Sequence, residues 1–185
     1  FTITVQDTQE PTIVCPSDIT VSVDPGVCGA HVTYSMPTAT DNCATPVAAV
    51  NSDATQVSGS LFAVGSTTVQ LQSADAAGNI GTCSFSITVM DYEAPAFTCP
   101  SDITMPTGLG LSGAYVAYVL PAANDPCDGV VAVTPVDNAQ APGSLFPVGI
   151  TTVQLQTADN SGNTATCSFS IAVVDGEPPS FTPPA

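Results

Sequence analysis

The stretch SLFAVGSTTVQLQSADAAGNIGTCSFSITVMD (60–91) returns 84 residues later as SLFPVGITTVQLQTADNSGNTATCSFSIAVVD (144–175). The two stretches differ at nine of 32 positions. The same offset relates VCPSDIT (14–20) to TCPSDIT (98–104). A long match at a fixed offset is the signature of a repeated structural unit. The 185 residues therefore hold two copies of one unit, and we place them at 11–94 and 95–178.

Both ends of the chain copy parts of the same unit. FTITVQD (1–7) resembles the end of the first copy, and SFTPPA (180–185) resembles the start of the second. We interpret 1–10 as the last strand of a preceding repeat plus a linker, and 179–185 as the start of a following repeat. A window from a longer tandem array explains this arrangement most simply. Strand exchange between neighbouring subunits of a fibre is the alternative.

The repeated stretch alternates apolar and polar residues, which is typical of strands. Phe85, Ile87 and Val89 are predicted to face one way and their serine and threonine neighbours the other. Val, Thr and Ile are common, whereas the 17 prolines and the absence of Lys and Arg disfavour helices. Short strands separated by turn residues in an 84-residue unit predict an all-β chain of tandem immunoglobulin-like antiparallel β-sandwich domains.

Charge excludes several classes of function. The chain has 16 acidic residues and no Lys or Arg, so its formal net charge is −16. Nucleic-acid binding requires cationic side chains to replace phosphate counterions, so we expect no nucleic-acid partner. No apolar run approaches the roughly 20 residues of a membrane-spanning helix, so we expect no membrane insertion. The carboxylates must face water, accept hydrogen bonds or bind cations.

The motifs CPSDIT, PTATDNC, GSLFxVGxTTVQLQxADxxGN and TCSFSITVxD together resemble the hyalin repeat (HYR) module, over essentially the whole chain. Such modules are similar to immunoglobulin-like sandwiches and occur in tandem in matrix, adhesion and surface proteins. The resemblance implies an extracellular or cell-surface structural role. Because the chain has no recognised nucleophile constellation, we do not expect an enzyme.

Seven cysteines in two small β domains indicate an oxidising compartment. The first and last strands of such a sandwich run parallel, so we predict the disulfides Cys15–Cys83 and Cys99–Cys167. For the remainder we favour Cys28–Cys43, which leaves Cys127 unpaired. The rival pairing, Cys15–Cys28 with Cys43–Cys83, would leave Cys99 unpaired instead.

Acidic and amide residues gather in the linkers and in two loops of each unit. Parallel first and last strands would bring the linker and both loops to one end of each unit. Four carboxylates without a neutralising Lys or Arg would repel one another, and Ca²⁺ accepts six to eight oxygen ligands. The residues expected to bind it are, at the first junction, Asp7, Glu10, Asp41, Asn42, Asp75 and Asn79, and, at the second, Asp91, Glu93, Asn124, Asp125, Asp159 and Asn163. Ordinary solvated turns are the alternative.

The sequence thus predicts an extracellular structural repeat segment of a rod-like or fibre-forming surface or matrix protein, rigidified by disulfides and interdomain calcium. The expected partners are neighbouring copies of the same repeat, through end-to-end self-association or a longer tandem array. Hydroxyl-rich strand faces make O-linked glycans possible. The alternative function is an adhesive module that recognises a glycan or a protein.

Overall fold

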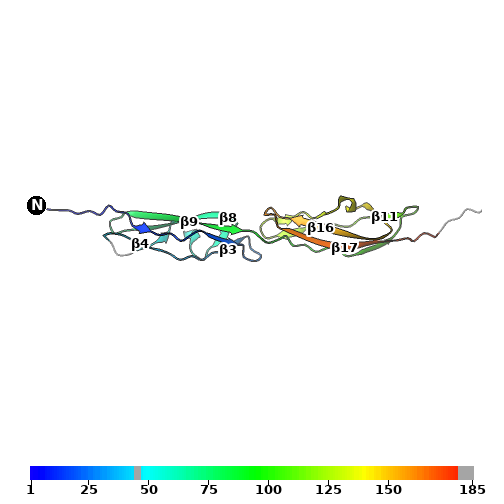
Figure 1. Ribbon diagram of the computed structural model, residues 1–185, viewed down its shortest axis with the longest axis horizontal. Coiled ribbons are helices and arrows are strands. Elements are labelled where there is room, and N and C mark those ends of the chain that lie inside the picture. The colour runs from blue at the N-terminus through cyan, green and yellow to red at the C-terminus, as the bar shows by residue number, and fades with distance from the viewer. Residues whose placement is uncertain (44–46, 179–185) are drawn as a thin grey trace, which may run out of the picture. The chain divides into compact units, whose positions relative to one another are not determined.

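The computed structural model describes residues 1–43 and 47–178. They form two compact units, Phe1–Tyr92 and Glu93–Ala185, each of which appears in Figure 1 as two facing layers of strands. The interpretation of residues 179–185 as the start of another repeat lies outside the described residues. Residues 1–10 precede the first strand, and Phe1, Ile3 and Val5 are exposed there.

The described residues of the first unit form nine strands and one 3-10 turn. They are β1 (Thr12–Ile13), β2 (Ile19–Ser22), β3 (Gly29–His31), β4 (Thr38–Thr40), β5 (Val47–Ala48), β6 (Val50–Asn51), η1 (Ala54–Gln56), β7 (Leu61–Ala63), β8 (Gly65–Ala74) and β9 (Ile80–Met90). The main sheet has the order β2-β9-β8-β6, and it is accompanied by β1-β4-β5 and by the pair β3-β7.

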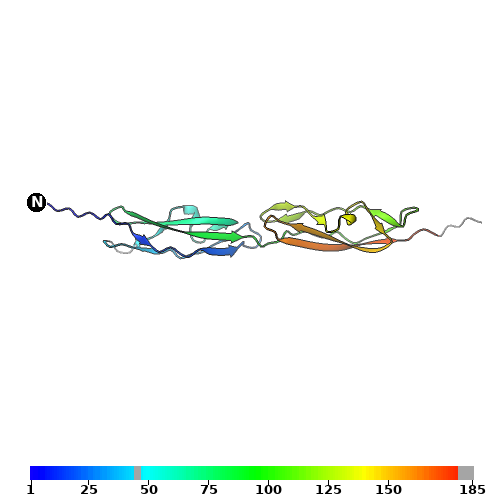
Figure 2. The ribbon, with the colours of Figure 1, turned by 45° about the horizontal axis from the view of Figure 1, so that its top comes forward.

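The second unit repeats this plan. Its elements are β10 (Ile103–Pro106), β11 (Gly113–Val116), β12 (Ala123–Asp125), β13 (Gly129–Val131), β14 (Thr134–Pro135), η2 (Asn138–Gln140), β15 (Ser144–Pro147), β16 (Gly149–Ala158) and β17 (Thr164–Val174). The main sheet is β10-β17-β16-β14, with the pairs β11-β15 and β12-β13 beside it. Figure 2 shows the long hairpin of each unit from a second side.

Strand pairing confirms the predicted fold class. The hairpins β8–β9 and β16–β17 are antiparallel, whereas β2 runs parallel to β9 and β10 runs parallel to β17. Ile19 pairs with Ile87, and Ile103 pairs with Ile171. The described residues include only single 3-10 turns as helix. The strand order and pairing make each unit an immunoglobulin-like β-sandwich.

The alternation in the sequence matches burial. Val69, Leu71 and Ile87 are each fully buried, and the polar residues between them face outward. The core of the second unit contains the equivalent residues, and the ring of Tyr118 meets Phe169 edge-on with centroids 5.1 Å apart. Such aromatic pairs add about 1 kcal/mol beyond the burial of their area. The hydrophobic effect therefore acts on the same positions in both units.

Two equivalent glycines allow close strand approach. A Cβ on Gly29 would lie 2.6 Å from the carbonyl oxygen of Phe62, and one on Gly113 would lie 2.2 Å from that of Phe146. Contacts below 3 Å with the main chain require a backbone shift. Both units therefore require glycine at this position.

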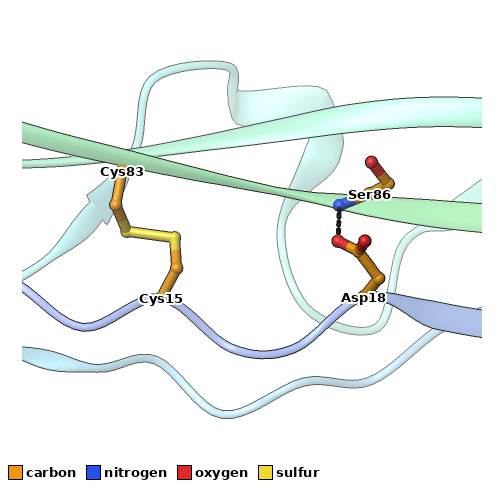
Figure 3. Close-up of a disulfide and its surroundings, with 4 residues drawn as sticks. All are labelled: Cys15, Asp18, Cys83 and Ser86. Carbon is orange, nitrogen blue, oxygen red and sulfur yellow. Dashed lines mark hydrogen bonds between the residues drawn. A yellow bond between two sulfur atoms is a disulfide. The ribbon is translucent and has the colours of Figure 1, made fainter.

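The two main disulfides are confirmed. Cys15 bonds Cys83 with a Cα–Cα distance of 5.8 Å, as Figure 3 shows. Cys99 bonds Cys167 with a Cα–Cα distance of 5.9 Å. Each joins the segment just before the first strand of the main sheet to the start of the last strand, where the parallel register brings the two Cα atoms within disulfide reach.

The prediction for the other cysteines is wrong. Cys43 is a free, exposed thiol, so it does not pair with Cys28. Cys127, which we expected to be unpaired, is disulfide-bonded, and so is Cys28. The rival pairing is also excluded, because it needed Cys15 and Cys83 for other partners. The prediction was based on which cysteines have an equivalent in the other repeat. Disulfide formation depends instead on which two thiols lie close together in the fold.

Among the described residues, no helix has the length and apolar character needed to cross a membrane.

Candidate metal centre

The turn between β8 and β9 holds a carboxylate in a fixed orientation. Asp75 is 8% exposed. Its Oδ1 accepts the main-chain N–H of Asn79 at 2.8 Å, and its Oδ2 accepts the side-chain amide of Asn79 at 2.7 Å. The side-chain hydrogen bond from Asn79, with further main-chain N–H groups of the turn, lowers the pKa of Asp75 despite its burial. The carboxylate is therefore anionic and preoriented.

The N-terminal segment joins this turn within the first unit. The side-chain amide of Asn79 donates to the main-chain oxygen of Asp7 at 3.3 Å. Asp7, Asp41 and Cys43 each place one ligand atom within 4.8 Å of the other two. The structure therefore brings together Asp7 and Asp41 as predicted, and it adds a thiol that the sequence assigned to a disulfide.

One oxygen of Asp41 is unusual. Its Oδ1 accepts the N–H of Cys43 at 2.8 Å, but its Oδ2 is buried and has no hydrogen-bond partner among the described residues. Burial without a partner is costly for an ionised group. Desolvation raises the pKa of the Cys43 thiol, and the negative charge of the Asp7 carboxylate raises it further.

The second unit repeats the turn between its long strands. Asp159 Oδ1 accepts the N–H of Asn163 at 2.7 Å, and Oδ2 accepts the amide of Asn163 at 2.8 Å. Desolvation would raise the pKa of Asp159, but hydrogen bonds from Asn163 and from the main chain of Gly162 and Ser161 outweigh it and lower the pKa. Asp159 is therefore held as an anion in the same manner as Asp75.

The loop between β12 and β13 supplies a second carboxylate. Asp125 is 5% exposed, and its Oδ1 accepts N–H groups from Cys127 at 2.7 Å and Asp128 at 3.0 Å. Its Oδ2 is buried, and no donor in the described part of the chain reaches it. Asp41 and Asp125 are equivalent residues of the two units, so the same oxygen lacks a hydrogen-bond partner among the described residues of both.

The sequence analysis missed a third acid in the second unit. Asp125, Asp128 and Asp159 each place one carboxylate oxygen within 4.8 Å of the other two. Asp128 breaks the repeat, because Ala44 stands at the equivalent position. An acid three residues after Asp125 in the same loop was the available signal.

The remaining predicted ligands differ in exposure. Glu10 and Asn42 are exposed, Glu93 is half-buried, and Asp91, which directly follows β9, is 7% exposed. Asn124 is exposed and exchanges two main-chain hydrogen bonds with Ala96, each of 2.9 Å.

His31, the only histidine in the sequence, is exposed at the end of β3. Its Nδ1 lies 2.6 Å from Oδ2 of Asp24, and hydrogen bonds from the His31 side chain and main chain lower the pKa of that carboxyl. Asp24 lies before β3, and neither residue of this pair is part of the acidic groups described above.

The donor set defines what these groups can do. In the second unit the group offers carboxylate oxygens alone, and the chain has no Lys or Arg to neutralise them. Hard cations with flexible oxygen coordination, above all Ca²⁺, fit such donors. The groups found among the described residues contain no histidine, and Cys43 is the one free thiol in them. Such a donor set does not suit a structural zinc site.

Tandem β-sandwich units, each closed by its own disulfide, are characteristic of extracellular repeat modules. The sequence model of the HYR domain matches residues 6–89 and 90–173, so the chain belongs to the HYR domain family.

Named relatives agree with this assignment. Hyalin from Lytechinus variegatus is 36% identical over 190 residues, which cover 100% of this chain and 35% of that protein. Hyalin from Strongylocentrotus purpuratus is 37% identical over 192 residues, covering 98% of this chain and 15% of that protein. The Sushi, von Willebrand factor type A, EGF and pentraxin domain-containing protein 1 of Rattus norvegicus is 31% identical, covering 94% of this chain and 5% of that protein. The chain thus spans about a third or less of these relatives, none of which is named as an enzyme.

Solved structures similar to the chain include human protocadherin-24 EC1-2, with a TM-score of 0.40 and 15% identity over 92% of this chain and 100% of that chain. Mouse cadherin-23 EC22-24 has a TM-score of 0.39 and 13% identity over 90% of this chain and 67% of that chain. The fold assignment rests on the strand pairing described above.

Proposed function

We propose that this chain is a structural segment of a rod-like or fibre-forming extracellular protein, in which HYR repeats are stiffened by disulfides and by bound Ca²⁺. The disulfides and the family place it among extracellular repeat modules. Repeats that contact only their neighbours form quasi-one-dimensional assemblies. The partners of this segment are therefore other copies of the repeat, in the same chain or in another.

One observation carries the calcium part of the proposal. Asp41 and Asp125 are equivalent residues, and in both the Oδ2 atom is buried without a hydrogen-bond partner among the described residues. A single orphaned oxygen could reflect local packing. The same unpartnered oxygen occurs in both units, each time beside at least one further carboxylate. This supports a ligand that satisfies the oxygen, and an anionic oxygen binds a cation.

The net charge of −16 supports the same conclusion. No Lys or Arg is present to form an ion pair with any carboxylate. Ca²⁺ tolerates the irregular mixture of carboxylate, amide and main-chain oxygens that these turns provide, whereas Mg²⁺ requires nearly ideal octahedral geometry and retains its waters. Binding of Ca²⁺ would also reduce the repulsion between successive acidic repeats.

Thermal unfolding of the whole chain, with Ca²⁺ and with excess chelator, tests the calcium part. An ion that binds only the folded state stabilises it by about 2.7 kcal/mol at 100 times its Kd. We therefore expect a higher Tm with Ca²⁺ and reversal by chelator. An identical Tm in both conditions across millimolar Ca²⁺ would contradict it.

Two solution measurements test the structural part. Small-angle X-ray scattering with and without Ca²⁺ reports whether the ion reduces flexibility between repeats, and sedimentation velocity reports self-association. We expect the scattering curves to indicate a narrower distribution of conformations with Ca²⁺ than without it. Scattering curves that do not change on chelation would remove calcium from the stiffening of the array and leave that role to the disulfides and the prolines.

A further inference from the structure

Asp128 forms hydrogen bonds with two turns of the second unit, the β12–β13 loop and the β16–β17 turn. Its Oδ2 accepts the main-chain N–H of Asn160 at 2.7 Å, and its Oδ1 accepts the side-chain amide of Asn160 at 2.7 Å. Its own N–H donates to Asp125 Oδ1 at 3.0 Å. Asn160 follows Asp159 directly in the β16–β17 turn. Asp128 therefore ties the loop that carries Asp125 to the turn that carries Asp159.

The hydrogen-bonded residues Asp128 and Asn160 occur only in the second unit. The residue equivalent to Asp128 is Ala44, and the residue equivalent to Asn160 is Ala76. Alanine at both positions removes the carboxylate and the amide that holds it. The first unit instead draws on Asp7, from the segment that precedes its first strand. The group in the first unit therefore has two carboxylates and a thiol, whereas the group in the second unit has three carboxylates.

The backbone fixes the Asp128 loop in place. Asp125 pairs with Gly129 across the β12–β13 hairpin, and Gly129 has a φ of 70°, in the left-handed region that favours glycine. Asp125 Oδ1 accepts two N–H groups of the same loop, which is the usual way in which an aspartate closes a turn. Asp125 and Asp128 thus start from one rigid turn and not from a long loop.

The second, independent observation is the buried oxygen of Asp125. This residue is 5% exposed, and its Oδ2 has no hydrogen-bond partner in the described ranges 1–43 and 47–178. Its carboxylate belongs to the group whose oxygens lie within 4.8 Å of one another. Three carboxylates at this spacing repel, and a buried one with an unsatisfied oxygen is destabilising unless a cation is bound.

We propose that Asp125, Asp128 and Asp159 form a calcium site contained wholly within the second unit, which the first unit cannot form from its own loops. This site rests on the proposed function, because it is one of the calcium sites of the array, and it names the ligands of that site. Three anionic ligands from two hydrogen-bonded turns bind Ca²⁺ with little reorganisation. The second unit therefore binds the ion more tightly than the first.

Calorimetric titration of the whole chain with CaCl₂, after treatment with chelator, tests this site. We expect the wild type to show a tighter and a weaker class of site. Asp128→Asn, which retains an oxygen acceptor of the same size, is expected to weaken the tighter class on the order of tenfold or more, because affinity follows the number of charged ligands. The weaker class should be unchanged. Asp137→Asn is the matched control, since Asp137 caps η2 in the same unit and lies outside the group.

The outcomes separate this site from the proposed function. Loss of the tighter class in Asp128→Asn, with Asp137→Asn like the wild type, supports the site. Equal isotherms for Asp128→Asn and the wild type, with Ca²⁺ still bound, overturn this site and leave calcium binding elsewhere in the array intact. No heat of binding in the wild type contradicts both proposals.

A second measurement covers a variant that disturbs the loop. In ¹H–¹⁵N spectra of the wild-type chain, Ca²⁺ should shift the amide signals of Asp128, Gly129 and Asn160 at concentrations below those that shift Asn79. Shifts at Asn79 first, or no shift at Asn160 at saturation, would overturn the assignment of Asp128 as a ligand.

Discussion

Oδ1 of Asp18 accepts a hydrogen bond from the main-chain N–H of Ser86 at 2.7 Å, and 84 residues later Asp102 accepts the same bond from Ser170, also at 2.7 Å. The partners are 68 residues apart, as are the cysteines of the Cys15–Cys83 disulfide, and Ile19 pairs with Ile87 at the same separation. Figure 3 shows the disulfide and the carboxylate side by side between the same two segments. Because β2 begins only at Ile19, the Asp18 side chain supplies the acceptor that the main chain does not.

Replacing Asp18 by alanine tests the importance of this bond. Asp18→Ala leaves the N–H of Ser86 without its acceptor, and we expect a loss of about 1 kcal/mol in the free energy of unfolding. Urea unfolding followed by far-ultraviolet circular dichroism measures the loss. Asp18→Asn retains an acceptor oxygen and is expected to restore most of the stability. Equal stability of Asp18→Ala and the wild type would show that the bond has no net effect.

Removing either main disulfide should destabilise its own unit by a similar amount. The two bonds close loops of the same separation, 68 residues, and the chain-entropy model assigns about 4 kcal/mol to such a loop. The double variants Cys15→Ser/Cys83→Ser and Cys99→Ser/Cys167→Ser should therefore lower the Tm of one calorimetric transition each. A loss confined to one variant would show that strain or packing, and not loop length, determines the effect.

Alkylation of the native, non-reduced protein should label one cysteine per chain. Cys43 is the free thiol, whereas the other six cysteines are in disulfides. The reaction should be slower than that of a small thiol at pH 8, because the raised pKa of Cys43 reduces the thiolate that reacts. Pepsin digestion and mass spectrometry locate the label, since the chain has no trypsin sites.

Asp7→Asn provides the control for that rate. It removes a negative charge that raises the pKa of Cys43, so labelling should accelerate. Labelling of Cys28 or Cys127 at a comparable rate would contradict the disulfide assignment.

The Asp75–Asn79 turn should contribute stability that depends on pH. The pKa of Asp75 is lowered from an ordinary value of 3.8 in the folded state, so ionisation favours folding. This contribution is complete above about pH 5 and is lost as the pH falls through the folded-state pKa. In the presence of chelator, Asp75→Asn should therefore have a lower Tm than the wild type at pH 7, and the two should converge by about pH 2.

Asn79→Ala removes the side-chain donor and tests the cause of that shift. Its Tm should also approach that of the wild type in acid. A constant Tm difference from pH 7 to pH 2 for either variant would show that the turn acts through packing and not through the ionised carboxylate.

Much of the fold could be predicted from local pattern. The alternation at Phe85, Ile87 and Val89 identified the buried face, because successive side chains of a strand point to opposite faces and the apolar set is excluded from water. The parallel relation of the first and last strands followed from the sandwich topology, and it correctly paired Cys15 with Cys83. These are properties that a repeated sequence carries twice.

The candidate site was predictable only in part. Asp75, Asn79, Asp159 and Asn163 are turn residues with recognisable spacing, and each Asp–Asn pair is hydrogen-bonded within its turn. Glu10 was expected in the same group and is exposed outside the group that Asp7 and Asp41 form. Linker residues follow no periodicity, so the positions of their side chains depend on contacts with residues that are distant in the sequence.

The sequence by itself determined the repeat of 84 residues, the all-β class, the acidic surface and the two disulfides that close the units, because periodicity, composition and strand order are local or additive properties. Only the tertiary structure decided that Cys43 stays free, that Asp128 joins Asp125 and Asp159, and that Oδ2 of Asp41 and of Asp125 is buried with no hydrogen-bond partner in the described part of the chain. Those facts depend on which loops meet in space. Two copies that differ at a few loop positions, such as Ala44 and Asp128, share a fold and still differ there.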